Sequence, residues 1–273
     1  MFEIFTVDFM QNALIAGIIV SLISGIIGSL IVVNRMVFLA GGIAHTSYGG
    51  IGFAIFFGLP IFLGASLFAV AASALMAFLT IKYKERVDTF IGLIWATGMA
   101  IGVILIDLTP GYNVDLMSYL FGSILAVETA DIYTMLGVLS IILIFVIFGY
   151  RNILAVSYDS EYAHIRGINV GLFYTLILVI SSIGIVMTMK VVGLILVISM
   201  LTIPVFIAEK ISSSLIGMMI YSGLISAFFT IIGLMVSYNY NLTTGATIIL
   251  VSVIGMILFL TIQKLFDLKN RIL

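Results

Sequence analysis

The side chain best suited to metal chemistry is His45, which lies in the glycine-rich stretch 36–58, MVFLAGGIAHTSYGGIGFAIFFG. At ~1.5 Å per residue, a helix of this length extends roughly 35 Å, enough to cross a ~30 Å hydrocarbon core. His45 would then lie near the bilayer midplane, where an ionisable group is costly unless it faces a polar cavity, an ion or a partner. This position favours a conduit for a divalent cation, with a packed or hydrogen-bonded core histidine as the structural alternative.

One imidazole is an incomplete metal site. Zinc takes about four ligands, and its catalytic-type sites use three protein ligands plus water. The missing ligands could come from water, from the hydroxyl groups of Thr46 or Ser47, from methionine sulfur, or from a second copy of the chain. A transported ion must also leave, so a sparse site is chemically reasonable. Because only neutral imidazole coordinates a metal, acid should weaken binding.

Motifs for other chemistries are absent from the sequence. The chain has no cysteine, which excludes disulfides and thiolate metal sites. It has no phosphate-binding G-x-x-x-x-G-K-[ST] loop, no H-E-x-x-H and no G-x-S-x-G, so neither nucleotide hydrolysis nor an intramembrane hydrolase is expected. The second histidine, His164, lies in a polar connection. A formal charge of −1 gives no reason to expect nucleic-acid binding.

The elements that must position His45 are predicted membrane helices. Of 273 residues, 63% are hydrophobic and only 8% are charged, whereas a soluble domain carries roughly 25% charged residues. We therefore expect an all-α polytopic bundle in which residues 1–273 form one transmembrane domain. About nine spans are expected, with eight or ten as alternatives. The apolar runs fall at about 13–33, 36–58, 61–81, 89–108, 131–149, 170–189, 191–208, 215–236 and 246–263.

The distribution of Lys and Arg predicts the orientation in a cell membrane. If the connection 82–88, KYKERVD, is cytoplasmic, strict alternation of spans leaves only Lys190 of the eleven basic residues outside. This arrangement places the N-terminus outside and the C-terminus in the cytoplasm. The outer connections then hold several acids, which either concentrate cations at the mouth or are ordinary solvated loop residues. These acids are Glu3, Asp8, Asp107, Asp115, Glu128 and Asp131.

Two segments do not fit a simple span. Residues 116–127 are too short to cross a bilayer, which predicts an interfacial helix or a re-entrant turn. Residues 150–169 form the longest polar connection, where Ser157 or Asp159 could cap a short helix that ends near Gly167. Glu161 suits the first turn of that helix. Such an element is either a docking site for a soluble partner or a well-capped connector.

The order and spacing of four blocks resemble the permease subunits of zinc/manganese ABC importers, which are relatives of cobalamin and iron–siderophore permeases. The blocks are VVNRMVFLAGGIAHTSYGGIGFA, DTFIGLIWATGMAIGVIL, DLMSYLFGSILAVETADI and VVGLILVISMLTIPVFIA. The resemblance implies a homodimer, or a pair of related permeases, bound to two separate ATPase subunits, with a metal-binding protein delivering the ion from outside. The chain itself would then not be an enzyme.

The same resemblance assigns a role to residues 150–169. In the family this loop holds a coupling helix that seats on the ATPase, with the pattern D-x-E-x-A-x-x-x-G. Asp159, Glu161 and Gly167 match that pattern, and Ala163 falls on its alanine.

One departure from the family concerns the metal. Many members carry G-D-x-x-x-H at the start of the second span, with the Asp one turn before the His on the same face. Here His45 is present, but Gly41 replaces the Asp. Loss of the carboxylate disfavours manganese, which prefers oxygen ligands, and favours zinc. Another divalent metal or a metal chelate is an alternative cargo.

The expected mechanism is alternating access driven by ATP hydrolysis in a partner chain, with His45 holding the ion transiently. The rival in the same architecture is a permease for a siderophore or cobalamin, which needs a wider cavity. A rival of another class is a stand-alone ion-coupled carrier, which usually needs an intramembrane carboxylate. An intramembrane enzyme lacks its catalytic residues.

Overall fold

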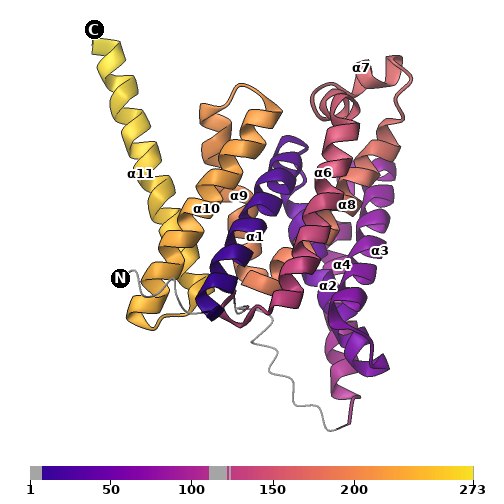
Figure 1. The fold of residues 1–273 in the computed structure, drawn as a ribbon. Helices are drawn as coiled ribbons and strands as arrows, with labels where there is room; N and C mark the ends of the chain where they lie inside the picture. The colour runs from indigo at the N-terminus through magenta and orange to yellow at the C-terminus, as the bar shows by residue number, and fades with distance from the viewer. Residues whose placement is uncertain (1–7, 111–121, 123, 273) are drawn as a thin grey trace.

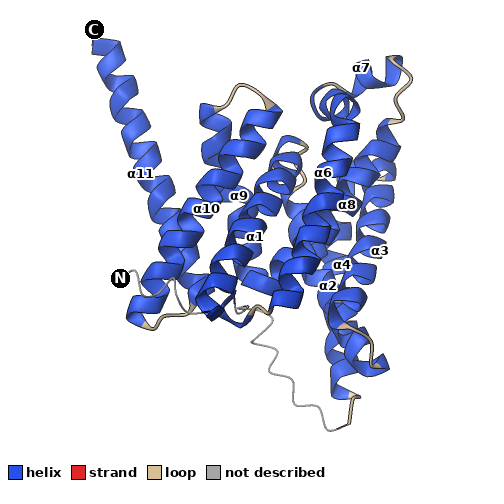
Figure 2. Ribbon diagram, viewed as in Figure 1, coloured by secondary structure: helices blue, strands red, loops and turns tan. Residues whose placement is uncertain are grey.

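The fold of the computed structural model is a bundle of long helices (Figure 1). The structure describes the backbone of residues 8–110, 122 and 124–272, and within these residues it contains helices and no strand (Figure 2). Each of the nine predicted apolar runs falls on one long helix, so the expected all-α architecture is confirmed. The helices are α1 (Asp8–Val33), α2 (Val37–Phe57), α3 (Ile61–Lys82), α4 (Val87–Asp107), α6 (Thr129–Tyr158), α8 (Val170–Val192), α9 (Leu194–Ile211), α10 (Leu215–Tyr240) and α11 (Thr244–Ile272).

Eight of these described helices are long and apolar enough to cross a membrane. The ninth, α2, has 21 residues and a less apolar middle, His45 to Gly50, although the same stretch is largely buried in the bundle. Burial against protein rather than lipid explains how a span can carry these polar and small residues.

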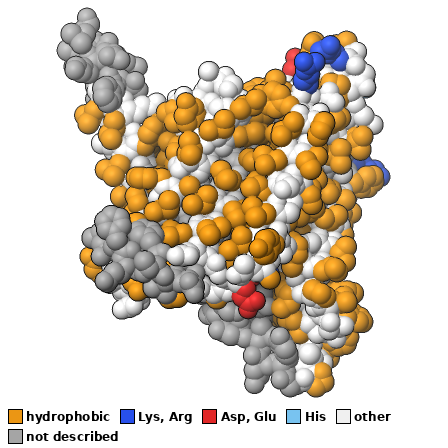
Figure 3. All heavy atoms as spheres, viewed as in Figure 1, with side chains coloured by type: hydrophobic (Ala, Val, Ile, Leu, Met, Phe, Trp, Pro, Cys, Tyr) orange, Lys and Arg blue, Asp and Glu red, His pale blue; other side chains and the backbone are white. Residues whose placement is uncertain are grey.

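Several turns and helix ends meet at one end of the bundle. One cavity there is lined by the α1–α2 turn, the end of α3, the start of α8 and the α9–α10 turn. The end of α6 and Ser160, the first residue of the short helix α7 (Ser160–Ile165), also line it. We call this the α7 end; the C-terminal end of α11 lies on the same side in Figure 1. On the face drawn in Figure 3, hydrophobic side chains cover the middle and basic side chains gather toward the α7 end. Lys190 and Asp131, both predicted for the opposite side, form an ion pair.

Two sequence expectations change at the ends of α6. The predicted run 131–149 is too short, because α6 continues to Tyr158 with Ile153 and Val156 buried against the bundle. The polar connection therefore begins at Asp159 rather than at residue 150. The predicted short element 116–127 lies mostly outside the described residues, and the described part contains the 3-10 turn Ile124–Ala126, which packs against α1.

Glycines let α2 lie directly against α3 and α4. A Cβ on Gly50 would collide with the carbonyl oxygen of Gly64 on α3, and a Cβ on Gly52 would collide with that of Gly102 on α4. A Cβ on Gly49 would lie 2.6 Å from the carbonyl oxygen of Gly98. Backbones this close gain packing contacts that membrane helices need in the absence of a hydrophobic driving force between them. The glycines of the second span therefore serve packing, as the sequence predicted.

Replacing Gly52 by alanine should separate α2 from α4, because the added methyl group meets rigid backbone. We expect a loss of about 1–3 kcal/mol, typical of overpacking, and a lower thermal unfolding temperature in detergent. Gly92→Ala on α4 is the matched control, since nothing lies within 4 Å of its added Cβ. Equal unfolding temperatures for the two variants would contradict the packing described here.

Candidate metal site

His45 lies near the middle of α2. It is the ninth residue of Val37–Phe57, so at ~1.5 Å per residue it sits about 12 Å from the start of the helix. Its side chain is half-buried, while the flanking Ala44 and Thr46 are buried. The imidazole is thus neither sealed inside the chain nor fully on the surface. It lies at a face of the single chain, near the middle of a helix that the sequence predicts to span the membrane.

The imidazole ring stacks on the ring of Trp95 from α4. The two ring centroids are 4.1 Å apart and the planes differ by 20°. Nδ1 of His45 is buried and has no hydrogen-bond partner among the described residues. An unpaired buried nitrogen costs free energy, and no described protein group offsets that cost. Because Nδ1 is buried, a ligand that reaches the half-buried ring from outside the chain would have to bind its other nitrogen, Nε2.

Gly41, one turn before His45, borders open space. A Cβ placed on Gly41 would meet one described atom within 4 Å, Cδ1 of Ile198 at 3.8 Å. Ile198 and Ile195 on α9 are themselves exposed. The missing carboxylate is therefore not replaced by another side chain packed into its position, and the space beside His45 is open at the surface of the chain.

The hydroxyl groups predicted as further ligands have other partners. Thr46 donates to the carbonyl oxygen of Gly42 at 2.7 Å and to that of Ile94 on α4 at 3.4 Å. Ser47 donates to the carbonyl oxygen of Ala44 and to the sulfur of Met189 on α8. Across the part of the chain that the structure describes, no three His, Asp or Glu side chains gather to hold a metal. In the described part of one chain, His45 therefore stands outside any group of three such ligands.

The short helix α7 has the caps that its sequence predicts. Asp159, rather than the alternative Ser157, is its N-cap, and its carboxylate accepts a hydrogen bond from the backbone N–H of Tyr162 at 2.8 Å. Glu161 lies in the first turn, and Gly167 follows the helix in the left-handed region at φ 76°. His164 belongs to this helix, far along the chain from His45 and on a different element. The two histidines thus do not form one site.

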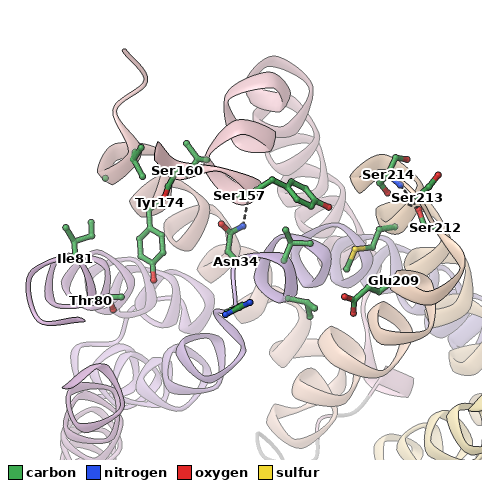
Figure 4. A pocket seen from close by; sticks show the side chains of 18 residues that line it. Asn34, Thr80, Ile81, Ser157, Ser160, Tyr174, Glu209, Ser212, Ser213 and Ser214 are labelled. Carbon is green, nitrogen blue, oxygen red and sulfur yellow. Dashed lines mark hydrogen bonds between the residues drawn. The ribbon is translucent and has the colours of Figure 1, made fainter. Parts of the chain in front are cut away.

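A cavity of about 940 Å³ opens at the α7 end. Figure 4 shows Thr80 and Tyr174 on one side of it, and Glu209 with Ser212 to Ser214 on the other. Between them, the side-chain amide of Asn34 donates to the hydroxyl oxygen of Ser157 at 2.9 Å. This bond joins the turn that leads into α2 with the end of α6 that leads into α7. Neither His45 nor Gly41 lines the cavity, and sequence reasoning did not find it, because its residues come from five separate segments.

The ABC 3 transport family profile matches residues 6–263. The chain belongs to the ABC 3 transport family. It is 43% identical over 257 residues to an uncharacterized membrane protein of Synechocystis, covering 94% of this chain and 92% of that protein. It is 32% identical to the manganese transport system membrane protein MntC of Listeria monocytogenes, covering 97% and 96%. The solved structure of PsaBC from Streptococcus pneumoniae in complex with Fab matches with a TM-score of 0.83 at 30% identity, covering 93% and 91%.

These relationships confirm the predicted resemblance to metal ABC importer permeases. Members of the ABC 3 transport family are membrane subunits of ABC importers, in which a separate chain carries the ATPase. The chain is accordingly a transport subunit and not an enzyme by itself. The MntC and PsaBC relationships cover more than nine-tenths of the chain, so the helices that carry His45, Trp95 and α7 all fall within the shared architecture.

Proposed function

We propose that this chain imports a divalent transition metal as the membrane subunit of an ATP-driven complex, with His45 as a transient ligand. The observation that carries the proposal is a half-buried imidazole near the middle of α2, beside the open space at Gly41. A relative in Listeria monocytogenes is named for manganese transport, which supports a metal ion as the cargo.

The donor chemistry favours zinc as that metal. Gly41 supplies no carboxylate one turn before His45, and among the described residues no three His, Asp or Glu side chains form a metal-binding group. Manganese prefers oxygen ligands, whereas imidazole suits zinc. The manganese names of relatives at 32% identity support the competing assignment, so metal preference is the first property to measure.

A second copy of the chain would complete the site. An imidazole on the surface of one chain, at the membrane centre, would otherwise face lipid at considerable cost. In a homodimer whose interface includes His45 and the exposed Ile195 and Ile198, that surface would instead face a second His45 across the ion path. Water would fill the remaining coordination positions of the ion.

The α7 end would face the cytoplasm and the ATPase subunit. The connections there carry most of the basic residues, and by the positive-inside rule this supports an N-terminus outside and a C-terminus in the cytoplasm. Asp159 and Gly167 fix the two ends of α7, so that Glu161 and the 84% exposed Ile165 are available to a partner. The Asn34–Ser157 bond then connects the docking helix with the turn before α2. A metal-binding protein would deliver the ion at the opposite, acidic side.

The stand-alone carrier is less well supported. Its expected intramembrane carboxylate could only have been Asp107, and Asp107 is the last residue of α4, at the end of the span. A chelate permease shares the architecture, but the cavity at the α7 end does not reach His45. Competition between free zinc and metal chelates in reconstituted uptake separates these functions.

Replacing His45 by alanine should weaken zinc binding by at least tenfold, because even the outer partners of metal ligands contribute 10–100-fold to affinity. Calorimetry on the purified full-length chain gives the dissociation constant, and uptake by the reconstituted complex gives KM. His164→Ala removes the other imidazole and is the matched control for affinity. Wild-type affinity and uptake in His45→Ala, at equal expression and limiting zinc, would remove His45 from the mechanism.

Replacing Gly41 by aspartate should shift the metal preference toward manganese. The side chain has room, and its carboxylate would lie one turn from His45 on the same face of α2. We expect competition uptake to show a several-fold gain of manganese relative to zinc. Gly41→Asn controls for size without charge. An unchanged manganese-to-zinc ratio in Gly41→Asp would show that this position does not contact the cargo.

Replacing Glu161 by lysine should weaken attachment of the ATPase while the permease stays folded, since exposed surface changes usually alter stability by only about 0.5 kcal/mol. Co-purification of the two subunits and zinc-stimulated ATP hydrolysis measure the effect. Glu85→Lys, in the α3–α4 turn, is the charge-reversal control. Normal co-purification of Glu161→Lys would argue that α7 is only a connector.

A further inference from the structure

Trp95 is the residue on which the proposed ligand rests. Its ring lies parallel to the imidazole of His45, with centroids 4.1 Å apart and 20° between the planes. In most metal sites, a hydrogen bond from the second imidazole nitrogen to a carboxylate or carbonyl oxygen fixes the orientation of the ring. Here Nδ1 has no such described partner. The contact that restricts rotation of the imidazole is therefore the stack on Trp95.

We propose that Trp95 is the positioning residue of the metal site and holds the His45 ring in the orientation that binds the ion. This inference rests on the proposed function of His45. A metal binds imidazole through a nitrogen lone pair in the plane of the ring, whereas Trp95 covers the face of the ring. The stack therefore restricts the ring without the indole itself covering the in-plane lone pairs. Because Nδ1 is buried, Nε2 is the nitrogen that would bind the ion.

Contacts of α4 hold the Trp95 ring in place. Its indole N–H donates to the sulfur of Met99, one turn further along, at 2.9 Å. The spacing between α2 and α4 is fixed beside the stack, because a Cβ on Gly98 would lie 2.6 Å from Cγ2 of Thr46. Thr46 also donates to the carbonyl oxygen of Ile94, the residue before Trp95. Thr46 thus contacts α4 on either side of Trp95, at Ile94 and at Gly98, and these contacts hold the register of the two helices.

Two substitutions separate stacking from bulk. Trp95→Leu keeps an apolar side chain but removes the ring, and Trp95→Phe keeps an aromatic face. We expect Trp95→Leu to raise the zinc dissociation constant of the purified full-length chain by about tenfold or more, the effect of losing an orienting partner. Trp95→Phe should restore most of the affinity. Leu93→Ala, a 63% exposed position on the same helix, should bind zinc as the wild type does.

The chain offers a second, independent measurement. Trp95 is its only tryptophan, so the intrinsic fluorescence of the purified chain reports on this ring alone. Zinc should change the emission of the wild type with the half-saturation that calorimetry gives, and His45→Ala should abolish the change. The fluorescence measurement needs no Trp95 variant, so it tests the role of Trp95 even if Trp95→Leu fails to fold.

Three outcomes would overturn the assignment. Wild-type affinity in Trp95→Leu would show that the stack is dispensable, and equal weakening in Trp95→Leu and Trp95→Phe would show that only volume counts. Tryptophan emission that does not change at saturating zinc would show that Trp95 does not contact the metal site. Loss of binding in His45→Ala together with normal binding in Trp95→Leu refutes this inference alone, whereas normal binding in His45→Ala refutes the proposed function itself.

Discussion

The close approach of α2 to α3 and α4 is the constraint on which the rest of the structure depends. Backbone meets backbone at Gly50 and Gly64 and at Gly52 and Gly102, where no side chain could fit. Because these contacts fix the rotation of α2, they also fix which face carries His45 and Gly41. The same contacts bring α4 near enough for Trp95 to stack on the imidazole. The glycine contacts that pack α2 therefore also determine the geometry of the candidate metal site.

That arrangement leaves the single chain chemically incomplete. One imidazole and the space beside Gly41 do not make a closed metal site, which suits an ion that must be released. At the α7 end, a capped helix with exposed Glu161 and Ile165 likewise has a surface without a described partner. Both features would have a direct physical reason in the proposed assembly with a second permease copy and an ATPase.

Much of this fold could be predicted from the sequence because membrane helices are encoded locally. Long apolar runs gave all nine long helices, and the residue types at Asp159 and Gly167 gave the ends of α7. The end of α6 was misplaced, since the polar residues after 149 suggested a loop while Ile153 and Val156 continue its buried face. His45 was found by its depth in a span. Its partner Trp95 was not found from the sequence. The contact between them depends on how two helices fifty residues apart are rotated, and a local sequence pattern does not predict that rotation.

The most direct test of the central claim is the position of zinc in the assembled importer. Anomalous scattering at the zinc edge, from crystals of the zinc-loaded complex, locates the ion without assumptions about its ligands. We expect the ion at about 2.0–2.1 Å from an imidazole nitrogen of His45, the usual Zn–N distance, with a second permease copy across from it. Zinc bound elsewhere along the path, for example among the oxygen atoms of the cavity at the α7 end, with His45 free, would contradict it.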